Sequence, residues 1–316
     1  MNEIILQQIF NALTMGSIYA LIALGYTMVY GVLRMINFSH SELFMLGGYV
    51  SLLVLAMLAG SSGLPGPLAL AGVLLVTFCA VGLVGVTTER VAYRPLRHGN
   101  RLAPMLSALG VSIVFQSSMQ LAVGPQPIAF PAVVEATRYE ILGASVTSLQ
   151  IFVFILAIVL LVGLEFLVEK TRLGIMVRAV AENHVTASLL GINVDRTVSL
   201  IFFVGPGLGA LAGFLYGAYY GVVTPTMGVI VGLKAFTAAI LGGIGSIRGA
   251  ALGGFLLALL EVGGTALLPI VSNGMIGTEY RDIFAFSILI LVLLFRPAGL
   301  LGENIADATS ITKREF

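Results

Sequence analysis

Long stretches without a charged side chain are the feature that most limits how this chain can fold. They cover residues 4–33, 43–88, 102–134, 197–233 and 283–295. About 20 apolar residues in a helix cross the ~30 Å hydrocarbon core of a bilayer. A charge at the centre of such a helix costs roughly 2.5–3.5 kcal/mol on insertion scales. Charges gathered between apolar runs are therefore typical of a chain that crosses a membrane several times.

Composition supports the same conclusion. Of the 316 residues, 58% are hydrophobic and 10% are charged, whereas soluble chains are about 45–50% apolar and about one quarter charged. The net charge of +1 gives no strong field for a polyanion. The single Cys79 cannot form an internal disulfide, and His40, His98 and His184 show no spacing typical of metal ligands. Disorder, a secreted disulfide scaffold and a basic nucleic-acid binder are excluded, and we predict no metal site.

Backbone groups in lipid must bond within the protein, so the spans must be helices or a closed barrel. The runs lack the period-2 alternation of barrel strands, which favours an all-α, polytopic transmembrane bundle forming one domain over residues 1–316. Residues 231–268 could cross twice, form one long bent span, or dip in as a re-entrant hairpin at the glycine-rich turn 242–245. We therefore expect nine spans, or eight. They lie near residues 5–33, 36–59, 67–88, 102–123, 148–168, 197–220, 231–247, 250–268 and 283–296.

Basic residues predict the orientation, because they are enriched in cytoplasmic loops. They concentrate in residues 89–101, in residues 169–196 and in the C-terminal tail, whereas none precedes Arg34. We therefore expect the N-terminus outside and the C-terminus inside. The first span is expected to be an uncleaved anchor, since no basic segment precedes it and no cleavage site follows it.

Glycines recur every four residues in two segments, and residues four apart share one helix face. Glycine on such a face lets a second backbone approach closely. The pattern predicts helix packing within the bundle; a subunit interface or a pathway lining is the alternative. The residues concerned are Gly205, Gly209, Gly213, Gly217 and Gly221, followed by Gly245, Gly249 and Gly253.

The segment 35–43 places polar side chains at the start of a span. One interpretation is a short solvated loop with Ser39 or Ser41 as a helix N-cap. The alternative is that Asn37, Ser39, His40 and Glu42 face a translocation path, since irregular backbone at membrane depth is tolerated where it lines a cavity. Three ionisable residues near span edges, Glu165, Lys234 and Glu261, are expected to be interfacial, snorkelling or paired.

The loop 169–196 is the longest one expected inside. Its middle predicts a helix with a small, apolar surface, preceded by Gly174 and ended by Gly191 at the C′ position. Arg178 and Glu182 are four residues apart on one face of it. Such a helix could lie on the lipid surface or dock into a groove of a partner protein. With four basic and three acidic residues in this loop, we prefer docking.

This loop resembles the EAA-type cytoplasmic loop of bacterial ABC-importer permeases, in which a glutamate-alanine segment precedes a glycine. Asn183 and His184 replace the alanines that follow the glutamate, and no Leu-Pro follows, a departure typical of one branch of these permeases. The matching residues are Ala181, Glu182, Ala187, Gly191 and Ile192.

Four blocks, at residues 25–49, 89–97, 178–196 and 232–254, are similar in content and order to the branched-chain amino acid permease family of LivH type. The resemblance covers nearly the whole chain. It implies a subunit of the bacterial inner membrane that works by alternating access and imports branched-chain amino acids. Urea, short-chain amides and other amino acids are substrates of close relatives.

The resemblance also implies partners: a second, LivM-type permease, two cytoplasmic ATPases of LivG and LivF type, and a periplasmic solute-binding protein. ATP and magnesium would be used by those partners, because this chain has no G-x-x-x-x-G-K-[ST] phosphate loop. No cofactor and no catalytic residue is expected here. Glu182 would hold the loop helix in the ATPase groove through charge-assisted hydrogen bonds. The residues implied in coupling are Arg178, Ala181, Glu182, Ala187, Gly191 and Ile192.

Two other classes of function compete with this interpretation. An ion-coupled carrier or channel for a small polar solute would need ionisable groups at the membrane midplane or a polar pore ring, and the charge-free spans argue against both. An intramembrane enzyme would need a paired Ser/His, an HExxH motif or paired carboxylates at usable spacing. None occurs in the spans.

Overall fold

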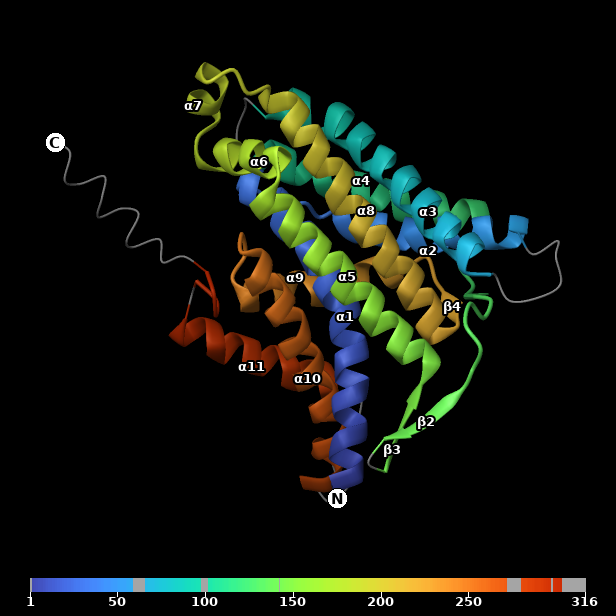
Figure 1. Ribbon diagram of the computed structural model, residues 1–316. Coiled ribbons are helices and arrows are strands. Elements are labelled where there is room, and N and C mark those ends of the chain that lie inside the picture. Colours follow the sequence, from blue (N-terminus) through green and yellow to red (C-terminus); the bar gives the residue numbers. More distant parts are fainter. Residues whose placement is uncertain are drawn as a thin grey trace.

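The computed structural model describes residues 2–58, 66–97, 102–141, 143–271, 280–296 and 298–302. These residues are helical apart from short strands and connections (Figure 1). The helices are α1 Asn2–Leu33, α2 His40–Leu58, α3 Pro67–Thr88, η1 Glu89–Tyr93, η2 Arg94–Leu96, α4 Leu102–Val123, α5 Ser148–Lys170, α6 Arg172–Glu182, α7 His184–Leu189, α8 Val194–Tyr220, α9 Met227–Gly242, α10 Ile247–Val271 and α11 Arg281–Phe295. The strands are β1 Ile128–Ala129, β2 Arg138–Ile141, β3 Ala144–Thr147 and β4 Val222–Val223.

Seven of the described helices are long and apolar enough to span a membrane: α1, α2, α3 with its extension, α4, α5, α8 and α10. Two further apolar helices are shorter. Helix α9 has 16 residues and α11 has 15, so each reaches only about 22–24 Å at 1.5 Å per residue. The polytopic helical fold is therefore confirmed, whereas two of the nine expected spans are shorter than a typical crossing.

The uncertain segment 231–268 forms two helices, α9 and α10, joined by a turn at residues 243–246. A single long bent span, one of the expected alternatives, is therefore wrong. Gly243 and Gly245 adopt positive φ angles of 109° and 101°, which residues with a Cβ atom rarely adopt. The two glycines explain why the chain turns sharply here.

Helices α1 and α8 form the centre of the bundle. In the most apolar 18-residue stretch of each of these two helices, 89% is buried inside the protein. The corresponding share is 28% for the α3 span, 22% for α5 and 6% for α4. Because α3, α4 and α5 leave large apolar side chains exposed, these helices provide the surface available to lipid or to another membrane subunit.

The two ends of the bundle differ. At one end the β2–β3 hairpin lies beside the start of α1, and the Ser145 amide donates to the Gln7 side chain at 2.9 Å. There β1 also pairs with β4, which joins the connection before α5 to the α8–α9 connection. At the opposite end lie α6 and α7 (Figure 1).

The glycines inside α8 lie where other parts of the same chain approach closely. Gly221 does not share this packing, contrary to expectation, because it follows α8 with a φ of 69° and has open space at its Cβ position. A Cβ built on Gly213 would be 2.1 Å from the Phe44 carbonyl oxygen in α2, and one on Gly205 would be 3.4 Å from the Gly25 carbonyl oxygen in α1. A Cβ on Gly217 would meet the Phe130 ring at 2.7 Å. This face of α8 is thus covered by α1, α2 and the segment before α5.

In the second glycine series, at residues 245, 249 and 253, two glycines lie in a helix contact and one does not. Cβ atoms on Gly249 and Gly253 would come within 2.5 Å of carbonyl oxygens of Gly242 and Ala238 in α9, so both lie in the α9–α10 contact. Gly245 does not share their helix face, contrary to expectation. It precedes α10 and has open space around its Cβ position, so it matters for the turn and not for packing.

The α8 contact predicts that Gly213→Leu lowers the abundance of folded protein in the membrane several-fold, because the new side chain collides with the α2 backbone. The matched control is Gly163→Leu in α5, where a Cβ meets nothing within 4 Å. Quantitative immunoblotting of membranes and thermal unfolding in detergent would measure both. A Gly213→Leu protein as abundant and stable as Gly163→Leu would contradict this packing.

Candidate functional site

The loop expected to hold one helix contains two, α6 and α7, which we call with their flanks the coupling segment (residues 171–193). Asn183 separates them, and its side chain accepts the amides of Val185 and Thr186 as the α7 cap. Asparagine caps helices better than it continues them, which explains the break. Gly191 follows the C-cap of α7 and has a φ of 84°, as expected for the C′ position of a helix.

Gly174 does not precede the helix, contrary to expectation, because α6 begins at Arg172 and is capped by Thr171. A Cβ at Gly174 would lie 2.0 Å from the Val168 carbonyl oxygen of α5. Glycine is therefore required in this first turn of α6 because it lets α6 fold back closely against the end of α5.

Some of the residues implied in coupling are buried, and the others are exposed at the surface. Ala187 is buried, and Ala181 and Ile192 are partly buried against the core. Arg178, Glu182 and Gly191 are exposed. Arg178 donates to the Val168 carbonyl oxygen and makes no ion pair with Glu182. Within the described residues Glu182 has no ion-pair partner, so its carboxylate faces outward from the end of α6.

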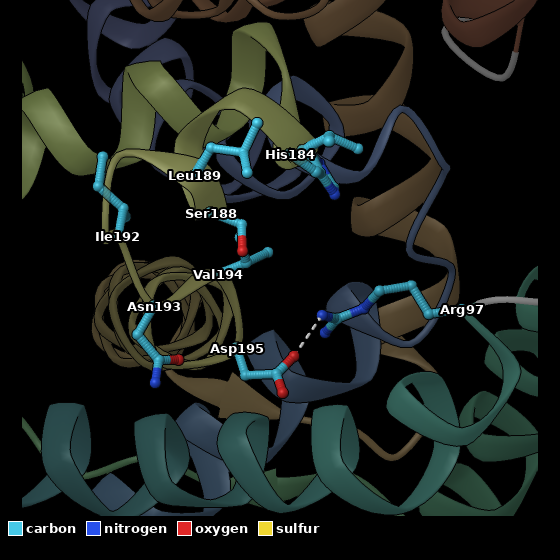
Figure 2. A pocket seen from close by; sticks show the side chains of 9 residues that line it. Arg97, His184, Ser188, Leu189, Ile192, Asn193, Val194 and Asp195 are labelled. Atoms are coloured by element: carbon cyan, nitrogen blue, oxygen red, sulfur yellow. Dashed lines mark hydrogen bonds and ion pairs between the residues drawn. The ribbon is translucent and has the colours of Figure 1, made fainter.

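A pocket of about 540 Å³ separates α7 from the start of α8. Figure 2 shows His184, Ser188 and Leu189 on its α7 side, opposite an ion pair between Arg97 and Asp195. The two charged groups are 2.9 Å apart. The lining residues are Arg97, His184, Val185, Ser188, Leu189, Ile192, Asn193, Val194 and Asp195.

A buried carboxylate fixes the end of α3 to the start of α8. Glu89 is fully buried in the π-helical turn η1 and accepts from Arg94 at 3.0 Å and from Arg97 at 2.6 Å. Ser199 of α8 donates to the same carboxylate at 2.9 Å. A buried charge is tolerated when it is paired and hydrogen-bonded, and Glu89 meets both conditions. The sequence analysis missed Glu89, although it is the only acid among the basic residues of 89–101.

His184 connects the coupling segment to the central helix. Its Nε2 lies 2.9 Å from the Val32 carbonyl oxygen near the end of α1. Because a carbonyl oxygen only accepts, Nε2 is the protonated nitrogen of this ring. Two residues beyond Val32, Arg34 has a φ of 52°, an uncommon backbone conformation for a residue with a side chain. The chain then enters the polar segment 35–42, which we call the polar break.

The polar break is not a solvated loop, contrary to that interpretation. Asn37, Ser39, His40 and Glu42 are each at most 1% exposed. The Asn37 side-chain oxygen accepts from the Ser39 hydroxyl at 2.7 Å and from the Tyr93 hydroxyl at 2.5 Å. Tyr93 belongs to η1, which also contains Glu89. The polar break therefore bonds to the same short helix that carries the buried carboxylate.

His40 and Glu42 are packed into the bundle with unused hydrogen-bonding atoms. The His40 ring lies 4.8 Å from the Tyr26 ring, in space left by Gly25 and Gly209. One Glu42 oxygen accepts from Ser112 at 3.3 Å. Among the described residues, the other Glu42 oxygen and both His40 nitrogens have no hydrogen-bond partner. Buried polar atoms in this condition mark strained or functional positions.

A second charged cluster was only partly expected. Lys234 of α9 lies 2.7 Å from Glu261 of α10 and 2.8 Å from Asp282 of α11, and Tyr19 of α1 donates to Glu261 at 2.8 Å. Lys234 and Glu261 are therefore paired, one of the expected alternatives. The participation of Asp282 and Tyr19 has no local signal in the sequence, because it depends on how four helices pack.

Glu165, the third of these ionisable residues, is paired as well. Its carboxylate accepts from Arg248 of α10 at 2.6 Å, and Glu169 accepts from the same guanidinium at 2.9 Å. Since Arg248 is well exposed, this surface cluster contributes little to stability.

The Glu89 network predicts that Glu89→Gln lowers the free energy of unfolding by about 2–4 kcal/mol. The loss is below that of a fully buried pair because Arg94 is partly exposed. Denaturant unfolding in detergent would measure it. Glu140→Gln, an exposed glutamate at the opposite end, should change stability by less than about 0.5 kcal/mol. Equal stability of the two variants would show that the arginines do not depend on Glu89.

Comparison with known proteins identifies the family to which the sequence of this chain belongs. The family model described as branched-chain amino acid transport system, permease component, matches residues 8–293. The chain is 42% identical over 302 residues to the high-affinity branched-chain amino acid transport system permease proteins BraD of Pseudomonas aeruginosa and LivH of Escherichia coli, covering 94% of this chain and 96% of each relative.

A third relative is less similar. The probable branched-chain amino acid transport permease protein LivH of Methanocaldococcus jannaschii is 28% identical over 93% of this chain and 91% of the relative. No solved structure matches the chain. The match to the family model and the long alignments agree with the helical bundle and its motifs, and this chain belongs to the family of permease components of branched-chain amino acid transport systems.

Proposed function

We propose that the chain is the permease subunit through which a binding-protein-dependent ABC importer moves branched-chain amino acids across the bacterial inner membrane. Residues 1–316 form one permease domain, with residues 169–196 as its coupling loop. The observation that carries the proposal is an outward-facing Glu182 on a helix pair anchored to the bundle core. The names of the BraD and LivH relatives support the substrate.

We propose that this importer also contains the subunits that hydrolyse ATP and bind the solute, as separate chains. Two ATPases of LivG and LivF type bind ATP and magnesium and contact the coupling segment. A LivM-type permease completes the pathway, and a solute-binding protein delivers the amino acid. The N-terminus and the β2–β3 hairpin then face the periplasm, and α6, α7 and the C-terminus face the cytoplasm. The basic residues of 89–97 and 170–196 support this orientation.

The coupling segment has the two properties needed to transmit a movement. Ala187 and Ile192 hold α7 against the bundle, and Arg178 bonds to the end of α5. Glu182 and the apolar side chains of Leu189 and Leu190 remain exposed. A surface of this kind suits a groove in a partner, in which the carboxylate makes charge-assisted hydrogen bonds.

His184 provides a direct route from that surface to the interior. Its bond to the Val32 carbonyl oxygen lets a displacement of α7 act on the end of α1 and thus on the polar break. We propose that the break lines the pathway in another conformation of the permease, since Asn37, Ser39, His40 and Glu42 are buried here. Alternating access requires such a second state, which the ATPases would favour.

We expect Glu182→Lys to abolish amino acid uptake while the permease still inserts into the membrane, because the reversed charge opposes docking of the ATPase. Uptake of radiolabelled leucine by cells and the membrane abundance of the protein would be measured together. Glu140→Lys changes a glutamate that is also exposed but lies at the other end of the bundle, and this variant should transport normally. Undiminished uptake by Glu182→Lys would refute the docking role.

Opening of the polar break can be tested by cysteine accessibility. With Cys79 replaced by serine, Ser39→Cys should react with a small, charged thiosulfonate reagent several-fold faster during ATP hydrolysis than at rest, because water then reaches the break. Ser51→Cys is the control, since Ser51 is also fully buried in α2 but lies away from the break. Ser39→Cys labelling as slow as Ser51→Cys labelling in both states would show that no water-filled path opens there.

A further inference from the structure

A second pocket, of about 560 Å³, lies between the end of α3 and the start of α8. It combines arginines with apolar side chains, and we call it the cationic pocket. The lining residues are Val86, Arg90, Arg94, Asn193, Asp195, Arg196, Ser199, Leu200 and Phe203.

Two of its three arginines are uncompensated. Arg94 is held by Glu89 at 3.0 Å and approaches Asp195 at 4.0 Å. Arg90 and Arg196 are exposed and have no ion-pair partner among the described residues. The pocket therefore offers two guanidinium groups without an ion-pair partner, Arg90 from η1 and Arg196 from α8. Guanidinium groups bind phosphate oxygens in bidentate geometry.

The position of Arg90 relative to a bilayer follows from the length of α3. The span continues past α3 to Leu96, but its charge-free part is the 22 residues of α3. They span about 33 Å, close to the ~30 Å hydrocarbon thickness. Arg90 lies just beyond this charge-free stretch, which places it at headgroup depth. At seven-residue steps before it, Leu83 and Val76 are 60% and 47% exposed, which makes the face leading to Arg90 an apolar surface open to lipid chains.

We propose that the cationic pocket binds the headgroup of an anionic phospholipid, with its acyl chains along Val76 and Leu83. The apolar wall of Val86, Leu200 and Phe203 favours a lipid over a free soluble anion, because only a lipid satisfies both the charge and the apolar surface. Basic pockets between membrane helices bind such headgroups. This inference goes beyond transport and requires only that α3 spans a bilayer.

Native mass spectrometry of the purified full-length permease would test it with short-chain phosphatidylglycerol and phosphatidylcholine as probes. We expect the wild-type protein to prefer phosphatidylglycerol by roughly 30-fold for two basic groups near the surface. The double variant Arg90→Gln, Arg196→Gln should lose that preference. The double variant Arg138→Gln, Arg172→Gln removes the same charge from exposed positions outside the pocket and should retain it.

Three results would overturn the proposal. Equal binding of the two lipids by the wild-type protein would show that the pocket does not select a charged headgroup. Retained preference in the Arg90 and Arg196 variant would place the lipid elsewhere. Displacement of phosphatidylglycerol by millimolar inorganic phosphate, or by the ATPase subunits in the assembled complex, would identify a soluble anion or a protein contact as the occupant. None of these results bears on uptake by Glu182→Lys, so this inference and the proposed function can fail separately.

Discussion

Close approach of backbones between α8 and its neighbours α1 and α2 is the constraint on which the rest of the structure depends. Gly213 meets the carbonyl of Phe44, and Gly205 meets Gly25. In a membrane there is little hydrophobic driving force between helices, so association depends on packing and on polar contacts. Glycine faces provide the packing. Once α8 is in contact with α1 and α2, the polar break between those two helices is enclosed and its side chains are buried.

The enclosed groups explain why the site is more polar than the spans around it. The Asn37 side-chain oxygen accepts from the hydroxyls of Ser39 and Tyr93. The Glu89 carboxylate accepts from two arginines and a serine hydroxyl. Both clusters meet at η1, a π-helical turn of a kind frequent at functional sites. The proposed coupling segment borders the same region, because Arg97 lines the pocket beside α7 and also bonds to Glu89.

Periodicity and charge-free runs were sufficient to predict the helical bundle, the glycine contacts of α8 and an exposed helix in the coupling loop, because these depend on local composition. The break at Asn183 and the position of Gly174 inside α6 depend on capping and on contact with α5, which hydropathy does not reveal. The burial of Asn37 and Glu42 could not be predicted for a similar reason. A polar segment between two spans is compatible with solvent until the third helix that covers it is known. Lys234 and Glu261 lie 27 residues apart, and only the α9–α10 turn brings them together.

The Lys234 cluster has a mechanical consequence. Its ion pairs join α9, α10 and α11, and the Tyr19 hydroxyl adds α1. Separating Lys234 from Glu261 in the low-dielectric interior would break a buried ion pair, which is strongly unfavourable. The four helices are therefore expected to move together as one rigid unit, and the less covered helices α3, α4 and α5 lie outside that unit.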